Sequence, residues 1–221
     1  TFKYSLTSHS ETKLVLTDEG EKLKIRFLTY ERTGLYIHDS YHCDSVYRSL
    51  AMKIFTQGSK KEDRTGTGTI SHFGNMIEFD ISKYVPALTT KKIFWKSVVE
   101  ELLWFLRGDT DATILNNKGV GIWKGNSSKE AQDKVGLGHL KTGDCGANYS
   151  FQWKHFGAEY KTCDDDYTGQ GIDQMAYIEN LLNTDKHSRR IFMSGWNPKD
   201  LDKTVLPPCH VSCQFYVDND D

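Results

Sequence analysis

Apolar and polar residues alternate along one stretch near the start of the chain. Residues 14–33, LVLTDEGEKLKIRFLTYERT, alternate on both sides of Asp18-Glu19-Gly20. A period of two residues is typical of a strand with one covered face, and a short polar stretch with Gly favours a turn. The pattern therefore predicts a β-hairpin over residues 14–33, followed by a linker at residues 34–42.

Helical periods replace the alternation at three later places. Residues 43–58 predict a helix that ends at Gly58, with one apolar face made by Val46, Tyr47, Leu50, Ala51, Ile54 and Phe55. Residues 93–109, IFWKSVVEELLWFLRGD, predict a longer helix ended by Gly108. Residues 173–182, DQMAYIENLL, predict a short helix with Asp173 as its N-cap.

Three further segments read as strands. They are GNMIEFDIS (74–82), RRIFMSGW (189–196) and the alternating stretch after His210, which we expect to begin at about Cys209 because two prolines precede it. Residues 116–171 are rich in Gly, Lys, Asp and Asn and predict extended loops. Helices and strands are thus mixed in one unit, which indicates an α/β (α+β) fold.

Composition narrows the class without naming a function. The chain has 221 residues, is 38% hydrophobic and 26% charged, and has a net charge of −2, so bulk charge predicts no nucleic-acid or membrane partner. Its longest strongly apolar run, LLWFL, is far too short to span a bilayer. Five cysteines without a C-x-x-C pair, and no signal-peptide pattern in the first residues, predict free thiols and a cytoplasmic location.

The stretch VLPPCHVSCQFYV (205–217) places Cys209 at the rigid start of a predicted strand. The thiol there is a nucleophile, a metal ligand or a core residue. The spacing of Cys209, His210 and Cys213 is not that of a structural zinc site, so we predict no metal. A Cys–His hydrolase is disfavoured as well, because adjacent strand residues point to opposite faces.

Other chemistry-bearing residues each have an ordinary structural explanation. Glu101 shares the apolar side of its helix with Val98, Trp104 and Phe105, which suits a desolvated proton shuttle, although its stem could simply pack while its carboxylate reaches water. The glycine-rich turn DRTGTGT holds an arginine that could bind phosphate, as could the adjacent cations of SRR (188–190). Trp123 and Tyr149 suit either a wall for a flat ring or the core.

Seven stretches occur in the order and wording of one enzyme family: DRTGTGT, LTTKKIFWKSVVEELLWFLRGDTDA, GIW, FQWKHFGAEY, GQGIDQ, SRRIFMSGWNPKDLDK and LPPCHVSCQFYV. On these motifs the chain resembles thymidylate synthase from about Tyr47 to its end. The resemblance implies that family's fold, in which a mixed β-sheet packs with helices and is used in dimerisation. It also implies reductive methylation of dUMP to dTMP, with 5,10-methylenetetrahydrofolate giving the carbon and the hydride and leaving as dihydrofolate.

The resemblance implies catalytic roles for four residues. Cys209 resembles the nucleophile that adds to C6 of the uracil ring, which activates C5 toward the one-carbon unit. Glu101 resembles the carboxylate that relays protons to the pyrimidine. Tyr149 and His210 resemble supporting residues of the active site.

Binding roles follow from the same motifs. Arg64 resembles the arginine that binds the nucleotide phosphate, whereas Arg189 and Arg190 resemble the pair that reaches the phosphate in the other subunit's site, which implies a homodimer with shared active sites. Four further residues resemble the family's wall against which the folate stacks: Ile122, Trp123, Asn126 and Leu206.

Two departures from the family pattern leave questions open. GDCGANYS (143–150) stands where the family usually reads GDLGPVYG; it keeps Tyr149, but Cys145, Ala147 and Asn148 change the local loop. The chain also ends before the family's QRS and D-x-x-LG-x-PFN segments. We therefore expect a polypeptide truncated at both ends. The alternatives are a pyrimidine-nucleotide hydroxymethylase of the same fold and an incomplete chain that only dimerises.

The start of the chain carries a second resemblance. IRFLTYERT is similar to the last strands of dihydrofolate reductase, and a linker leads from it into the synthase motifs, as in the fused bifunctional dihydrofolate reductase–thymidylate synthases; an unrelated extension is the alternative. The predicted division is a reductase hairpin at 1–33, a linker at 34–42 and a synthase domain at 43–221. NADPH would bind only in a reductase domain that these residues do not include.

Overall fold

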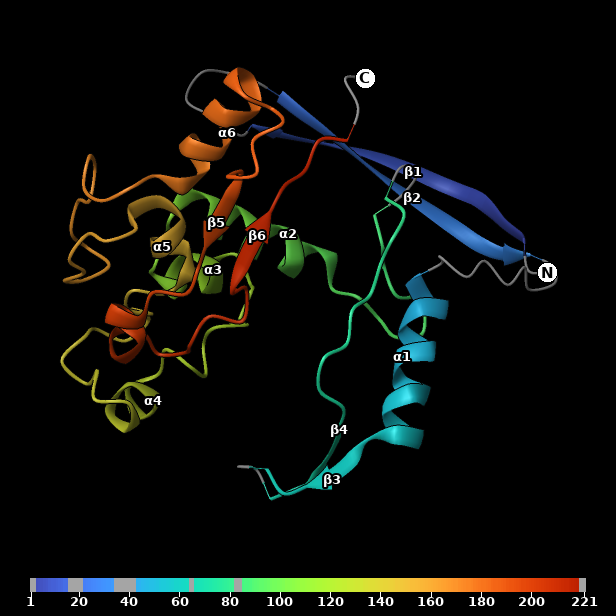
Figure 1. The fold of residues 1–221 in the computed structure, drawn as a ribbon, viewed down its shortest axis with the longest axis horizontal. Helices are drawn as coiled ribbons and strands as arrows, with labels where there is room; N and C mark the ends of the chain where they lie inside the picture. Colours follow the sequence, from blue (N-terminus) through green and yellow to red (C-terminus); the bar gives the residue numbers. More distant parts are fainter. Residues whose placement is uncertain (1–2, 16–21, 34–42, 64–65, 82–84, 219–221) are drawn as a thin grey trace. The chain divides into compact units, whose positions relative to one another are not determined.

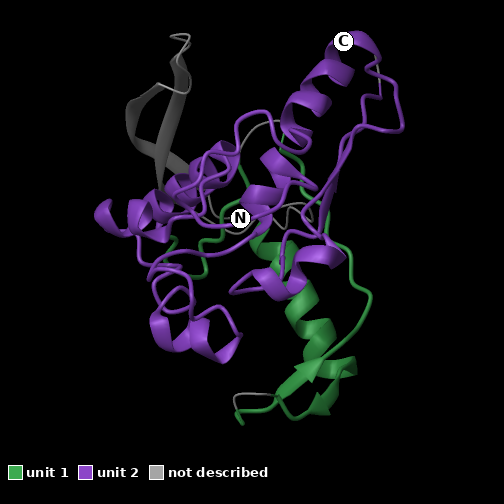
Figure 2. Ribbon diagram, turned by 90° about the vertical axis from the view of Figure 1, so that its left-hand side faces the viewer, with its two compact units in different colours: residues 1–93 green, residues 94–221 purple. Residues whose placement is uncertain are grey.

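The computed structural model describes residues 3–15, 22–33, 43–63, 66–81 and 85–218. The chain forms two compact units, residues 1–93 and residues 94–221, which Figure 1 traces along the sequence and Figure 2 colours separately. No helix among the described residues is both long enough and apolar enough to cross a membrane.

Unit 1 begins with an antiparallel hairpin. Its strands are β1 (Lys3–Val15) and β2 (Lys22–Thr33), with Lys3 opposite Thr33 and Val15 opposite Lys22. The predicted hairpin is confirmed, and the pairing reaches farther toward the start of the chain than the alternation indicated. The expected turn at Asp18-Glu19-Gly20 and the linker at 34–42 lie outside the described residues.

Among the described residues, the other regular elements of unit 1 are the helix α1 (Cys43–Gln57) and a small antiparallel hairpin, β3 (Ser59–Lys61) with β4 (Thr69–Ser71). The predicted helix is confirmed, and the backbone N–H of Gly58 donates to the carbonyl of Ile54 at its end (2.8 Å). The predicted strand at 74–82 is wrong over its described residues, because none of residues 74–81 pairs with another strand. Alternation marks a face, but a strand also needs a partner for its backbone groups.

Unit 2 is built around α2 (Trp95–Arg107), which ends where predicted. Gly108 caps it in the left-handed conformation (φ 77°), which glycine adopts without the strain a Cβ would add. On its apolar side Trp104 and Phe105 are buried in the main core, and α2 packs there against α5 (Tyr149–His155) and α3 (Ala112–Asn117).

The region 116–171 contains more helix than its composition predicted. Besides the end of α3 it holds α4 (Lys129–Lys134) and all of α5. Both are one or two turns long, too short for a 3.6-residue period to emerge, and each depends on a capping side chain. Ser128 Oγ accepts from the N–H of Ala131, and Asn148 Oδ1 accepts from the N–H of Phe151.

The end of unit 2 carries the segment that contains Cys209. Helix α6 (Gln174–Thr184) starts at the predicted N-cap, since Asp173 accepts from the N–H of Ala176 (3.0 Å). After it come β5 (Phe192–Ser194), the 3₁₀ helix η1 (Pro198–Lys203) and β6 (Ser212–Gln214), with β5 and β6 antiparallel and side by side in Figure 1.

Two predictions about these strands need correction. Strand β6 begins at Ser212 rather than at about Cys209, so Cys209 and His210 lie in an irregular segment between the proline pair and the strand. Arg189 and Arg190 do not open a strand on opposite faces but occupy a turn before β5. The ladder between β5 and β6 has only three residue pairs, from Phe192 to Ser194 with their partners. The segments that precede the two strands therefore lie outside it.

Candidate functional site

The predicted catalytic residues come together in unit 2. Tyr149 is the first residue of α5 and is buried, whereas the thiol of Cys209 is exposed. Burial raises the pKa of the Tyr149 hydroxyl, and nearby negative charge on Cys209 and Glu101 raises it further. The Tyr149 ring lies 5.7 Å from that of Trp123, whose indole donates to Glu101, and 5.5 Å from that of His210, which follows Cys209, so the predicted catalytic residues share one site.

His210 completes this group through its ring. The imidazole lies at the edges of two aromatic side chains, with centroids 5.5 Å from the Tyr149 ring and 5.9 Å from the Phe105 ring, and the Trp153 ring is 6.4 Å away. The residue as a whole is exposed. The imidazole is thus packed against the buried aromatic cluster while part of the side chain still meets solvent.

Glu101 is held by a partner that the sequence did not reveal. Its Oε1 accepts a hydrogen bond from Trp123 Nε1 at 2.8 Å. The neighbouring Glu100 instead forms an ion pair with Lys118 at 2.6 Å. One oxygen of the Glu101 carboxylate is therefore fixed by an indole, and the group is partly buried.

The residues predicted to stack against the folate differ in exposure. Trp123 is 2% exposed, and its ring lies 5.6 Å from Trp104 and 5.7 Å from Tyr149, inside the core. In the same loop Ile122 is 48% exposed and Asn126 is exposed, while Leu206 packs partly buried against the core. Ile122 and Asn126 therefore contribute to the surface of this loop that a ligand can reach, together with Lys124, whereas Trp123 is buried.

The described residues include two of the three arginines predicted to bind phosphate. Arg189 and Arg190 are exposed in the turn before β5, and neither guanidinium pairs with a carboxylate of the described residues. Both cations are thus available to an anion. Arg64 lies outside the described residues.

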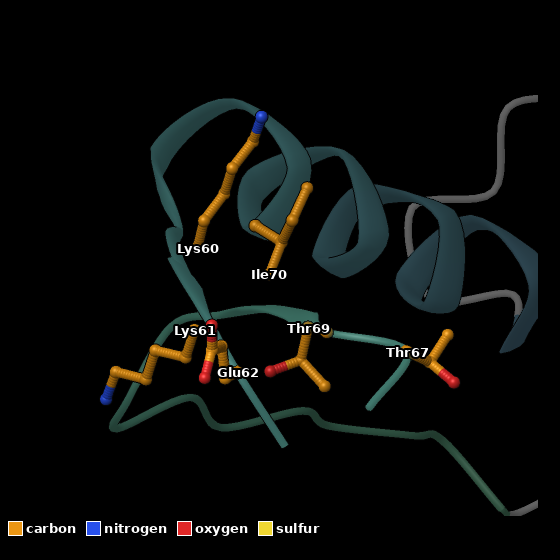
Figure 3. A pocket seen from close by; sticks show the side chains of 7 residues that line it. Lys60, Lys61, Glu62, Thr67, Thr69 and Ile70 are labelled. Atoms are coloured by element: carbon orange, nitrogen blue, oxygen red, sulfur yellow. The ribbon is translucent and has the colours of Figure 1, made fainter. Parts of the chain in front are cut away.

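A surface cavity of about 430 Å³ lies elsewhere, on the β3–β4 hairpin of unit 1 (Figure 3). Lys60 and Ile70 are directly opposite in the hairpin and lie on one side of it, while Lys61, Glu62 and Thr69 lie on the other. The charged groups therefore diverge and include both signs. None of the predicted catalytic residues lines this cavity, and we assign the chemistry to the cluster around Tyr149.

The unusual sequence GDCGANYS is well accommodated. Cys145 is fully buried in the main core, where burial and then the charge of Asp144 raise the pKa of its thiol well above the ordinary value. It is thereby unsuited to act as a second nucleophile. Asn148 supplies the N-cap of α5, so the residue before Tyr149 fixes the start of the helix that presents it.

One group of potential metal ligands contains its own cation. Single ligand atoms of Asp111, Cys163 and Asp164 lie within 4.8 Å of one another. The ammonium of Lys141 pairs with Asp164 at 2.5 Å and with Asp111 at 3.4 Å. Because the Lys141 ammonium already contacts both carboxylates and offsets one of their two charges, we assign no metal to the group.

Comparisons with known proteins agree with the motifs. The family model for thymidylate synthase matches residues 45–221. The thymidylate synthase of Candida albicans is 54% identical over 176 residues, which are 79% of this chain and 56% of the relative. The bifunctional dihydrofolate reductase-thymidylate synthase of Zea mays is 51% identical over 178 residues, 80% of this chain and 34% of the relative. That of Paramecium tetraurelia is 46% identical over 219 residues, 99% of this chain and 46% of the relative. The chain thus spans about a third to a little over half the length of these relatives.

Proposed function

The chain belongs to the thymidylate synthase family, and on this premise we propose that the protein methylates dUMP reductively to dTMP. The co-substrate is 5,10-methylenetetrahydrofolate, which supplies the one-carbon unit and the hydride and leaves as dihydrofolate. The observation that carries the proposal is the convergence of Cys209, Glu101, Tyr149 and His210, which come from three separate segments of unit 2.

Cys209 acts as the nucleophile. Its sulfur forms a bond to C6 of the uracil ring, and the electron pair displaced from the C5–C6 double bond makes C5 able to attack the one-carbon unit. Loss of the C5 proton accompanies cleavage of the bond between the one-carbon unit and the folate nitrogen. Hydride transfer from tetrahydrofolate to that carbon, with cleavage of the sulfur–C6 bond, then gives the methylated ring, the free thiolate and dihydrofolate. The exposure of Cys209 suits this role, because the thiol must meet a ring that arrives from solvent.

Glu101 moves protons to and from the pyrimidine. The hydrogen bond from Trp123 occupies one of its oxygens and leaves the other for a water or for the substrate. Tyr149 remains protonated because its pKa is raised, so it serves as a hydrogen-bond donor. His210, packed on Tyr149 and Phe105, lines the same site.

The folate fits best above the loop that carries Trp123. Ile122 offers exposed apolar surface and Asn126 an exposed amide, and the buried indole between them keeps that surface in place. Leu206 borders the segment of Cys209. These residues would orient the co-substrate next to the nucleotide and exclude water from it.

The nucleotide phosphate is bound by arginines. Arg64 would bind it in the same subunit, while Arg189 and Arg190, both exposed and without a carboxylate partner among the described residues, would reach the phosphate in the other subunit's site. This arrangement requires a homodimer.

Residues 1–33 form the end of a dihydrofolate reductase domain fused to the synthase. The hairpin of β1 and β2 and the match of 219 residues to the bifunctional protein of Paramecium tetraurelia support this part of the proposal. The synthase domain then begins at about residue 43.

The test is covalent trapping in the full-length protein. We expect incubation with 5-fluoro-dUMP and 5,10-methylenetetrahydrofolate to give an intact-mass increase equal to both ligands, because fluorine at C5 cannot leave as a proton does. In Cys209→Ser the adduct should be absent. Cys213→Ser, altered in a neighbouring cysteine on β6, is the matched control and should still form it.

Three results would contradict the proposal. They are the absence of an adduct with the native protein, an adduct that persists in Cys209→Ser, and conversion of dUMP to a 5-hydroxymethyl product when the natural substrates are supplied. The first would support a chain that only dimerises, and the last a hydroxymethylase of the same fold.

A further inference from the structure

The side chain of Gln174, in the motif GQGIDQ, makes three hydrogen bonds to backbone groups of two different elements. Its Nε2 donates to the carbonyl of Gln152 in α5 and to the carbonyl of Ser194 in β5, both at 2.8 Å. Its Oε1 accepts from the N–H of Ser194 at 3.0 Å. Both amide hydrogens and the amide oxygen are used, so the side chain is fully satisfied in one orientation.

The groups that Gln174 contacts have no partner in their own elements. Gln152 is in the last turn of α5, where carbonyls lack a helical donor, and the N–H that would follow, that of Phe156, donates instead to Ile172. Strand β5 pairs with β6 on one edge only among the described residues, so Ser194 presents its N–H and carbonyl on the other edge. A single side-chain amide at the start of α6 thus supplies hydrogen-bond partners to the backbone of a helix end and of a strand edge.

The two elements joined in this way carry the two sides of the catalytic cluster. Helix α5 begins with Tyr149. The end of β5 contacts the segment of Cys209, because the N–H of Gly195 donates to the carbonyl of Val211 at 2.9 Å. A Cβ on Gly195 would approach the His210 carbonyl to 2.5 Å and Tyr149 Cβ to 3.1 Å, so these three backbones are in close contact.

We infer that Gln174 is a positioning residue that sets the spacing between Tyr149 and the Cys209–His210 segment. The inference rests on the proposed function, since it concerns the reactivity of Cys209 toward the nucleotide. Without the amide, β5 keeps its ladder to β6 and its packing against α5 but loses the hydrogen bonds that fix Ser194 relative to Gln152, and the thiol loses its alignment with C6 of the ring. Alignment within a fraction of an ångström governs the rate of such an addition.

A second link between α5 and α6 provides a control. Lys154 pairs with Asp173, the residue before Gln174, but this ion pair does not reach β5. Removing it loosens α6 from α5 without freeing Ser194. Gln170 is a second control, because its exposed amide donates only to the nearby carbonyl of Asp166.

The experiment compares Gln174→Met and Gln174→Glu with Lys154→Met and Gln170→Met in the full-length protein. Stopped-flow or quenched mass spectrometry gives the rate constant of 5-fluoro-dUMP adduct formation at saturating folate, and the final adduct yield counts the folded sites. We expect the rate constant to fall about 10- to 100-fold in both Gln174 variants. The affinity for dUMP, the final yield and the two controls should stay within about threefold of the native protein.

Gln174→Glu adds a readout that loss of stability would not change. An ionised carboxylate accepts from Ser194 but faces two carbonyl oxygens, whereas a protonated one regains a donor. The ratio of its rate constant to that of the native protein should therefore rise as the pH is lowered from 8 to 6.

The outcomes separate this inference from the proposed function. A native protein that forms no adduct contradicts the proposed function. An adduct in the native protein with unchanged rate constants in both Gln174 variants overturns the positioning role. A lower yield with an unchanged rate constant overturns it as well, because it shows that the amide contributes to folding alone.

Discussion

Helices α1 and α2 have similar sequence patterns and different surroundings. Both carry apolar residues at helical spacing and both form where the pattern predicts. In α2 the apolar side holds Trp104 and Phe105, which are 0% and 3% exposed, whereas in α1 Met52 and Phe55 are 60% and 71% exposed. A periodic pattern is therefore enough to predict a helix, but the elements that cover it decide how much it stabilises.

The cover of α2 comes from residues distant in sequence. Phe105 meets Tyr149 at 4.8 Å between ring centroids, and Trp104 donates from Nε1 to the carbonyl of Asp111 at 3.0 Å. In unit 1 the best buried part of α1 is its first turn, where Asp44 accepts from the N–H of Thr89 at 2.8 Å. The packed side of α2 is also the side that supports the catalytic cluster.

The largest expected effect follows from this difference. Trp104→Ala should lower the free energy of unfolding of unit 2 by about 3–5 kcal/mol, because it removes a fully buried ring and leaves a cavity. Phe55→Ala in α1 should change the free energy of unfolding of unit 1 by about 0.5 kcal/mol or less, since that ring is exposed. Urea unfolding by tryptophan fluorescence checks unit 2 selectively, because all five tryptophans lie beyond residue 94, and far-UV circular dichroism follows both units.

A Phe55→Ala effect as large as that of Trp104→Ala would break the comparison. It would mean that α1 is covered in solution and that its exposed apolar residues are part of an interface.

The elements that the sequence predicted well are those with strong local signals. Gly108 ends α2 and Asp173 caps α6 as expected, because a left-handed glycine and an N-cap aspartate act within one turn. Helix α5 was missed although Asn148 is an ordinary N-cap, since seven residues show no period. The strand predicted at 74–82 failed because the alternation carries no information about a pairing partner.

In the candidate site, too, local motifs were predictable from the sequence and contacts between distant residues were not. The family motifs predict roles for Cys209, Glu101, Tyr149 and His210, and their ring contacts and the Trp123–Glu101 hydrogen bond place them near one another in unit 2, while the roles themselves stay predictions. The motifs did not reveal the hydrogen bond from Trp123 to Glu101, which joins residues 22 positions apart and depends on how a loop folds over a helix. The same holds for the amide of Gln174, whose partners lie on other elements.

The second prediction compares a buried carboxylate, that of Asp144, with an exposed one, that of Asp164. Asp144 is fully buried and accepts from the hydroxyl of Tyr160 at 2.6 Å and from the N–H groups of Gly146 and Cys163, both at 2.8 Å. Asp144→Ala removes the acceptor of three hydrogen bonds, of which only that from Tyr160 has a second acceptor among the described residues, Thr110 Oγ1, and should cost about 3 kcal/mol of unfolding free energy. Asp164→Ala, which removes an exposed partner of Lys141, should cost about 1 kcal/mol or less.

Equal losses in the two aspartate variants, measured by the same urea titration, would contradict this prediction. They would show that burial of the carboxylate costs as much as its three hydrogen bonds return.

The smallest effect is expected in alkaline solution, and it concerns ionisable groups around the same carboxylate. Burial, then the charges of Asp144 and Asp111, raises the pKa of the Cys163 thiol from 9.0 to about 12, and burial with the charge of Asp144 also raises the pKa of the Tyr160 hydroxyl above 10.0. The folded protein keeps these protons at a pH at which the unfolded chain has released them. The stability they contribute is thus fully present below pH 9 and declines as the pH rises toward 12.

The variant Tyr160→Phe removes one such group. The free energy of unfolding of this variant should therefore fall less steeply with pH than that of the native protein above about pH 10, while below pH 9 the two curves run parallel. Urea titrations at pH 8, 9, 10 and 11 measure both slopes. Parallel curves over the whole range would mean that the Tyr160 hydroxyl ionises equally in the folded and unfolded chain, and that burial beside Asp144 does not hold its proton.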